Sequence, residues 1–131
     1  MSAALALRRA VQARLNADPD LSALLGTRIY DRVPDRAAYP YVVQGAVETL
    51  PLDGEGAVQH LLTLEVWSRA PGRREALLIL HALTRALDGA APALDGHRLV
   101  SLRAISSAAL PDEGGGLYCA AAIFRAVTEP K

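Results

Sequence analysis

The sequence predicts an α+β fold, in which a mostly antiparallel sheet of about five strands carries one main helix on one face, with an N-terminal helix packed beside it. Two stretches of the chain have apolar residues at helical spacing, and five others have the β-branched and aromatic side chains typical of strands. Turns rich in glycine and proline join most of these strands directly, which favours antiparallel pairing. At 131 residues the chain is expected to form a single domain, residues 1–131.

The first predicted element is an amphipathic helix that Ser2 can cap. Its apolar positions share one side, and polar residues occupy the other. The apolar set is Leu7, Ala10, Val11 and Leu15, and the polar set is Arg8, Arg9, Gln12 and Arg14. Asp18-Pro19-Asp20 breaks this helix, and residues 21–25 add a short helical turn that Gly26 can end in the left-handed conformation.

Two short strands are predicted next, over residues 29–33 and 41–48, because both stretches are rich in β-branched and aromatic residues. The segment 34–40 begins and ends in proline, so it cannot continue a central ladder. Residues 50–56 are too many for a two-residue turn, but Asp53-Gly54 supplies turn chemistry. A projecting hairpin loop is therefore expected there.

The middle of the chain combines an alternating strand with the main helix. Strand residues 58–67 place Val58, His60, Leu62, Leu64 and Val66 toward the core, against Gln59, Leu61, Thr63, Glu65 and Trp67. Ala70-Pro71-Gly72 ends this strand, and a helix is predicted over residues 73–87. Its apolar stripe is Ala76, Leu77, Leu80, Leu83, Thr84 and Leu87.

The last two strands are predicted over residues 98–106 and 117–128, after a loop at 89–96. In the first, Val100, Leu102 and Ala104 alternate with Leu99, Ser101, Arg103 and Ile105. Residues 111–116 form a glycine-rich turn that should return the chain antiparallel. The alanines at 120–122 suit a helix too, but the aromatic and β-branched residues around them favour a strand.

Composition argues against several classes of function. Acidic and basic residues balance at 14 each, so no sequence-wide field draws the chain to nucleic acid or to an anionic membrane. The sequence has no apolar run long enough to span a bilayer, and Arg8 and Arg9 interrupt any signal-like segment, so cytosolic synthesis is expected. Cys119 is the sole cysteine, which excludes an intrachain disulfide.

The sequence predicts no catalytic residue, no cofactor and no metal site. The three histidines lie far apart, without metal-ligand spacing, and Cys119 has no activating cation beside it in the sequence. Asp53 with Glu55, and Asp112 with Glu113, lie in glycine-rich turns where nothing excludes water. The glycines at 114–116 precede a strand rather than a helix, so a phosphate-binding loop is not predicted.

Two sets of residues are typical of protein interfaces. Arginines at positions 28, 32 and 36 flank Tyr30 and Tyr39, and tyrosine with arginine is the chemistry that interfaces favour. A single-stranded nucleic acid could stack on the same residues, but the balanced charge disfavours that alternative. Trp67 lies on the strand face opposite the core, where it either packs on the N-terminal helix or contacts a neighbouring subunit.

Motifs along most of the chain stand in a characteristic order. The segment 17–26 ends the first helix, and Arg28-Ile29-Tyr30-Asp31 and Tyr39-Pro40-Tyr41-Val42-Val43 follow it. Leu64-Glu65-Val66-Trp67-Ser68 comes next, then the helix with Ala76, Ile79 and Leu87, and finally the strand from Tyr118-Cys119-Ala120 to Arg125. In this order the chain resembles the tail completion, or tail terminator, proteins of long-tailed phages and of phage-like gene transfer agents.

The resemblance implies a structural protein rather than an enzyme. Such proteins are small α/β domains that form a six-membered ring at the head-proximal end of a tail tube, stop tube growth and offer a surface to the head. The expected partners are other copies of the chain in a hexamer, the tail tube protein and a head-completion or connector protein. The expected location is the host cytoplasm during assembly and then the phage-like particle.

Within this expectation, the candidate interaction residues fall into four groups. They are Tyr30, Arg32, Tyr39 and Tyr41 for ring contacts or for bracing the sheet edge; Leu50, Leu52, Asp53 and Glu55 in the projecting loop; Trp67; and Asp112 with Glu113 in the last turn. Two alternatives remain open: another neck or head–tail connector protein, and a small ligand-binding or enzymatic α+β domain, which would need a concave pocket with convergent polar groups.

Overall fold

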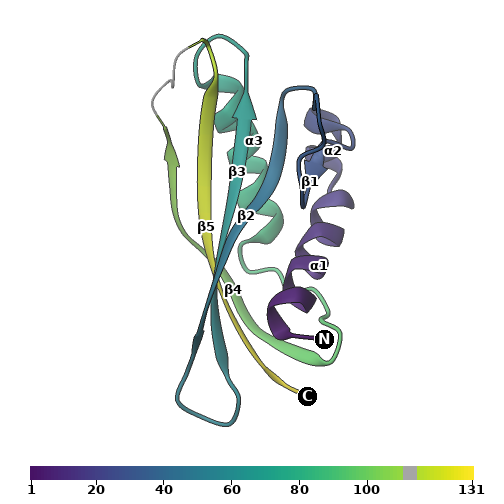
Figure 1. Cartoon of the computed structure of the whole chain (residues 1–131), viewed down its shortest axis with the longest axis vertical. Coiled ribbons are helices and arrows are strands. Elements are labelled where there is room, and N and C mark those ends of the chain that lie inside the picture. Colours follow the sequence, from purple (N-terminus) through teal and green to yellow (C-terminus); the bar gives the residue numbers. More distant parts are fainter. Residues whose placement is uncertain (111–114) are drawn as a thin grey trace.

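The structure, a computed structural model, describes residues 1–110 and 115–131. Its helices and strands follow one another in the predicted order (Figure 1). They are α1 (Ala3–Asn16), α2 (Pro19–Leu25), β1 (Ile29–Tyr30), β2 (Tyr41–Pro51), β3 (Val58–Ser68), α3 (Arg74–Leu87), β4 (His97–Ala109) and β5 (Tyr118–Pro130). The predicted α+β class is therefore confirmed.

The strands form one sheet in the order β1-β2-β3-β5-β4. The pairs β2–β3, β3–β5 and β4–β5 are antiparallel, as expected, whereas β1 runs parallel to β2. β1 is also shorter than the predicted strand 29–33. It ends at Tyr30 because the next residue, Asp31, turns its side chain toward α1, and Pro34 cannot donate a ladder hydrogen bond.

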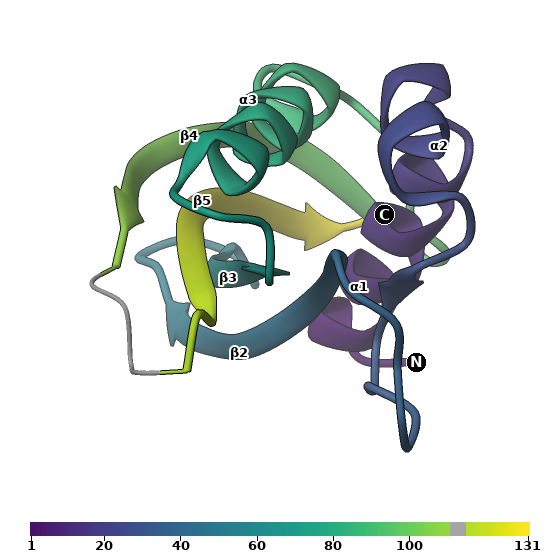
Figure 2. The same ribbon diagram turned by 90° about the horizontal axis from the view of Figure 1, so that it is seen from above.

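Helices α1, α2 and α3 contribute to one core on the same face of the sheet, as Figures 1 and 2 show. Ser2 caps α1 through its side chain, which accepts a hydrogen bond of 3.1 Å from the backbone N–H of Leu5, as predicted. The Nε of Arg14 on α1 donates to the carbonyl of Ala86 on α3 at 3.2 Å. α1 and α3 therefore lie beside each other.

At the end of α2, the backbone conformation of Gly26 differs from the predicted left-handed helical one. Asp18 caps α2 and Gly26 follows the helix, as expected. The φ of Gly26 is positive, at 60°, but its ψ of −120° lies outside the left-handed helical region. A side chain would be strained at this φ, so glycine is still required.

The alternation predicted for β3 is confirmed. His60, Leu62, Leu64 and Val66 are buried, and Val58 is half-buried at the end of the same face. On α3, however, Leu77 is 46% exposed and does not belong to the buried stripe, whereas Ile79 is fully buried. Successive helical residues lie about 100° apart, so Leu77 points away from the arc that Ala76, Ile79 and Leu83 bury.

Two bulges interrupt the alternation expected along β4. The register shifts between Leu99 and Ser101 and again between Ala104 and Ser106, so Val100 and Ile105 are the extra residues. Val100, which the alternation placed on the same face as Leu102, is 55% exposed as a result, and Ile105 is 50% exposed on the outer face where it was expected. Because β4 is an edge strand, such bulges also hinder pairing with another chain.

β5 is a strand rather than a helix, as predicted, and its core face is unusual. The side chains that face the helices are alanines at positions 120, 122 and 126, with Phe124 between them. Small residues allow α3 to approach the sheet closely, and Phe124 fills the space that remains.

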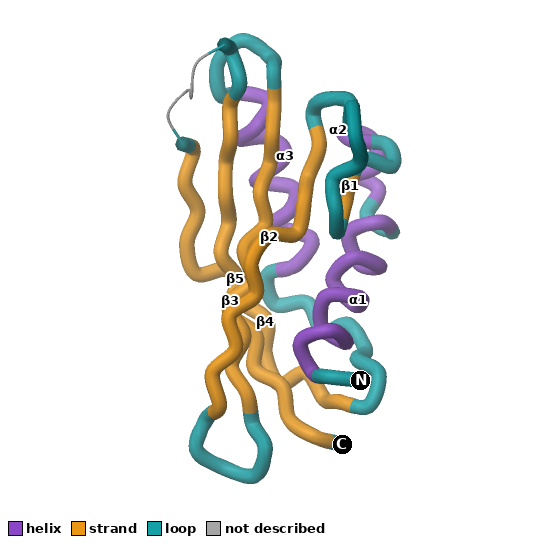
Figure 3. The backbone as a smooth tube through the Cα atoms, viewed as in Figure 1, coloured by secondary structure: helices purple, strands orange, loops and turns teal. Residues whose placement is uncertain are grey.

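β2 and β3 form a long hairpin arm, visible at the bottom of Figures 1 and 3, and β5 stays paired with β3 along the arm as far as Thr128 opposite Val58. Its paired residues run from Val47 opposite Leu62 to Pro51 opposite Val58. Midway along the arm, the buried ring of His60 hydrogen-bonds on both sides, to the Thr49 hydroxyl at 3.3 Å and to the Thr128 hydroxyl at 2.9 Å. This histidine ties β2, β3 and β5 together.

The stability of the fold is expected to decrease at mildly acidic pH because of His60. Burial lowers the pKa of His60 below its ordinary value, and the positive charge of His97 adds to the shift. The unfolded chain therefore takes up a proton near pH 6.5 that the folded chain resists, and the free energy of unfolding falls as the pH drops below that value.

Urea unfolding between pH 7.5 and pH 5 should show a steeper loss of unfolding free energy for the wild type than for His60→Gln. The exposed His81 supplies the control, since His81→Gln should keep the wild-type slope; equal slopes in all three proteins would contradict this assignment.

Candidate functional site

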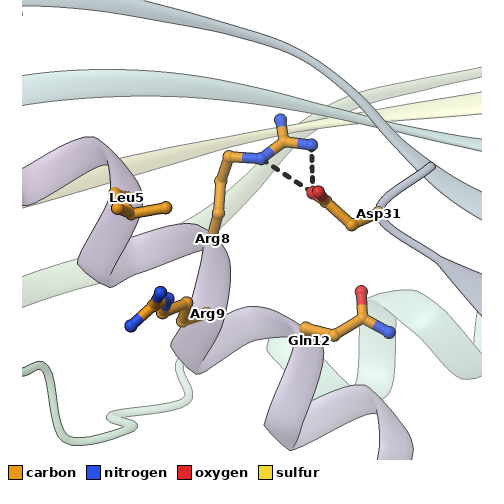
Figure 4. A pocket seen from close by; sticks show the side chains of 5 residues that line it. All are labelled: Leu5, Arg8, Arg9, Gln12 and Asp31. Atoms are coloured by element: carbon orange, nitrogen blue, oxygen red, sulfur yellow. Dashed lines mark hydrogen bonds and ion pairs between the residues drawn. The ribbon is translucent and has the colours of Figure 1, made fainter.

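Arg8 joins α1 to the edge of the sheet. Its Nη1 donates to the carbonyl of Gly45 at 2.8 Å, and its Nε donates to the Asp31 carboxylate at 3.0 Å. Figure 4 shows the guanidinium turned toward Asp31, with a second contact from Nη2 to the same oxygen, and Arg9 directed elsewhere. Because Asp31 neutralises Arg8, this arrangement positions the β1–β2 edge rather than offering a free cation.

Gln12, one helical turn after Arg8, makes a second contact between α1 and the β1–β2 edge of the sheet. Its Nε2 donates to the carbonyl of Ile29 at 2.8 Å, and its Oε1 accepts from the Nε2 of the buried Gln44 at 3.0 Å. The sequence placed Arg8 and Gln12 on the polar side of the helix but assigned them no partner. Their i, i+4 spacing was the available signal, since such residues share one helical face. The small cavity beside them, about 290 Å³, is lined by Leu5, Arg8, Arg9, Gln12 and Asp31.

The predicted interface residues of the 30–41 segment form an aromatic cluster. The ring centroid of Tyr41 lies 5.9 Å from that of Tyr30 and 5.2 Å from that of Tyr39. The Arg69 guanidinium carbon lies 4.6 Å from the Tyr39 ring centroid, a cation–π distance. Arg32 is exposed and makes no ion pair, ring contact or side-chain hydrogen bond with any described residue, so it stays outside the cluster.

Burial raises the pKa of the Tyr41 hydroxyl above its ordinary value, and Tyr39, Glu65 and Cys119 add to the shift. The Tyr39–Pro40 peptide bond is cis. Arg28 donates from Nε to the carbonyl of Pro40 at 2.7 Å, which holds this end of the loop against the start of β2.

An open pocket of about 420 Å³ lies beside the cluster. We call it the Tyr–Arg pocket, and it is lined by Val33, Pro34, Arg36, Ala37, Tyr39, Tyr41 and Arg69. Its lining contains two guanidinium groups and no carboxylate. The nearest acid along the chain, Asp35, is exposed and does not line it. The pocket therefore suits a group that carries negative charge.

The projecting loop is shorter than predicted. Leu50 and Pro51 belong to β2, where Leu50 pairs with Gln59, because the ladder continues further along the arm than the sequence suggests. The loop itself is 52–57, closed by a 2.9 Å hydrogen bond from the Leu52 N–H to the carbonyl of Ala57. Leu50 remains 58% exposed.

Asp53 and Glu55 stand at the tip of this loop. Both are exposed, and neither has an ion pair or side-chain hydrogen bond with any other described residue. The neighbouring Arg98 is paired with Glu129. The tip therefore carries two carboxylates whose charge is not neutralised by a partner in the described parts of the chain.

Trp67 lies on the sheet face turned away from the helices, since its neighbours Val66 and Ser68 are buried on the other face. It is half-buried and donates from Nε1 to the Glu65 carboxylate at 3.1 Å. Its role in subunit contact remains a prediction. Asp112 and Glu113 lie outside the described residues.

Within 1–110 and 115–131, no group of three or more His, Cys, Asp or Glu side chains could hold a metal ion. No helix in the described ranges is long and apolar enough to cross a membrane. Tyrosine and arginine side chains lie at the surface near the start of β2, and two carboxylates lie just beyond its end. Groups of these kinds are suited to contacts with other proteins.

Comparison with known proteins agrees with the resemblance seen in the sequence. The family model for tail completion protein gp17 matches residues 9–129. A solved chain of the virion of a native gene transfer agent (GTA) particle has a similar fold, with a TM-score of 0.91 and 31% sequence identity over 98% of each chain. Comparison with curated protein sequences gives no significant match. Because the family match covers nearly the whole chain, this protein belongs to the tail completion protein gp17 family.

Proposed function

We propose that this protein is a tail terminator. Six copies form a ring at the head-proximal end of a tail tube, where the ring stops tube growth and presents the surface to which the head joins. The observation that carries the proposal is the similarity, over 98% of each chain, to a component of an assembled virion particle. Its partners are then other copies of itself, the tail tube protein and a head-completion protein, met in the host cytoplasm before the particle is complete.

The fold suits a ring for a physical reason. A ring closes through a heterologous contact, in which two different surfaces of the protomer meet around an axis. The Tyr–Arg pocket and the acidic tip are two such surfaces, at opposite ends of β2. Neither is a large apolar patch, so each contact is modest. The isolated chain is then monomeric or weakly associated, and the tube end supplies the template that completes the ring.

Removing the protein from a particle-producing strain tests this function. Without a terminator, tail tubes should grow past their normal length and remain without heads, and a plasmid copy of the gene should restore both length and joining. Negative-stain electron microscopy measures the two properties together. A neck or connector protein would instead leave tails of normal length that lack heads, and that result would overturn the proposal.

A further inference from the structure

We propose that the acidic tip of one copy, Asp53 and Glu55, docks into the Tyr–Arg pocket of the next copy, where it meets Arg36 and Arg69. This inference rests on the proposed ring and specifies the contact that closes it. The partner is a second copy of this chain.

The pocket supplies the cationic half of the contact. Arg69 stacks on Tyr39, so its guanidinium is held in place while its N–H groups stay available at the surface. Arg36 is exposed, and like Arg69 it has no ion pair with any described residue. Arginine presents a planar set of donors that matches a carboxylate. Tyrosine rings beside it add apolar area, a combination that interfaces favour.

The loop supplies the anionic half. Asp53 and Glu55 lie on either side of Gly54 in the loop that projects at the end of the β2–β3 arm (Figure 1), where they line an open hollow with Arg98, Glu129 and Pro130. A projecting segment can enter a recess on a neighbour with little hindrance. The half-buried Leu52, just before the two acids, gives the tip an apolar base.

The two halves cannot meet within one molecule. Tyr41, in the pocket, begins β2, and Pro51, next to the tip, ends it. A straight strand of 11 residues spans about 33 Å, and because β2 has an irregularity between Gln44 and Val47, this length is the upper limit of the separation between its ends. The tip must therefore find the pocket of another copy. Repetition of a contact between opposite ends makes a closed ring or an open chain, depending on the angle between copies.

The contact is tested by reversing the charges of the tip in one variant and those of the pocket in another, and by mixing the two variants. The tip variant is Asp53→Arg with Glu55→Arg, and the pocket variant is Arg36→Glu with Arg69→Glu. In each variant every tip faces a pocket of the same sign, so the dissociation constant for self-association should rise about thirtyfold or more. Sedimentation equilibrium over micromolar to millimolar concentrations measures it, and circular dichroism verifies that each variant is folded.

The decisive sample is an equimolar mixture of the two variants. Reversed tips then meet reversed pockets, and wild-type tips meet wild-type pockets, so association should return to within about threefold of the wild type. The restored assembly should alternate between the two variants, which native mass spectrometry detects as equal numbers of each. A six-membered ring permits such alternation because its number of subunits is even.

A matched control reverses two other exposed arginines, Arg9→Glu with Arg85→Glu, and should leave association unchanged. If Arg69→Glu unfolds the chain, Arg36→Glu alone replaces the pocket variant and should be rescued in the same way.

Three results would each overturn the contact. The wild type could stay monomeric at millimolar concentration, the variants could associate as the wild type does, or the mixture could show no rescue. Tip variants that associate normally but fail to enter particles would point to the tail tube protein as the tip's partner. Tail length in the strain lacking the protein is measured separately, so a failed contact leaves the terminator function standing.

Discussion

Replacing Phe124 with alanine is expected to lower the free energy of unfolding by about 3–5 kcal/mol, the cost of removing a large aromatic side chain from a packed core. Phe124 is fully buried and pairs with Leu62 on one neighbouring strand and with Ala104 on the other. Its neighbours along the core face of β5, Ala122 and Ala126, are too small to fill the cavity. Since a domain of this size is stable by only about 5–15 kcal/mol, the variant should lose a large fraction of its total stability.

Urea unfolding followed by circular dichroism measures this loss. Ile123→Ala is the matched control, because Ile123 is adjacent on the same strand but half-buried on the outer face of the sheet. Its replacement should cost less than half as much. Equal losses for Phe124→Ala and Ile123→Ala would contradict the assignment of the two sheet faces.

Replacing Arg8 with methionine is expected to cost about 2–3 kcal/mol of stability, a value typical of lost hydrogen bonds to charged groups. Methionine keeps much of the apolar stem but removes every donor. The Gly45 carbonyl then loses its 2.8 Å hydrogen bond, and the Asp31 carboxylate loses its partner. The substitution should also loosen the β1–β2 pairing locally, since Arg8 holds this edge of the sheet against α1.

Arg9→Met is the control for this change, because Arg9 is the next residue on the same helix and is exposed. Its effect on the unfolding free energy should stay within about 0.5 kcal/mol. Hydrogen exchange adds a local readout: the backbone N–H of Val42, which donates to the Arg28 carbonyl at 3.0 Å, should exchange faster in Arg8→Met only. If the two variants were equally stable, the contact of Arg8 with the sheet edge would be refuted.

Much of the fold follows from patterns that are local in the sequence. The alternation of His60, Leu62, Leu64 and Val66 is enough to place β3 and its core face, because a strand turns successive side chains to opposite sides. Ser2 and Gly26 mark helix ends through their own chemistry. The order of helices and strands, the fold class and the resemblance to a family all depend on signals of this kind.

What the tertiary structure alone decided involves residues far apart in the chain. The bulges at Val100 and Ile105 reflect pairing with β5, and the start of the loop at Leu52 reflects how far β2 and β3 stay paired. Arg69 reaches Tyr39 only because β3 ends beside the start of β2. Local periodicity records which face a side chain takes, whereas register and side-chain partners depend on the energies of whole packed surfaces. For that reason the sequence could suggest tyrosine and arginine as interface residues, but only the fold brings Tyr39, Tyr41 and Arg69 together in one pocket and sets the acidic tip at the other end of the strand.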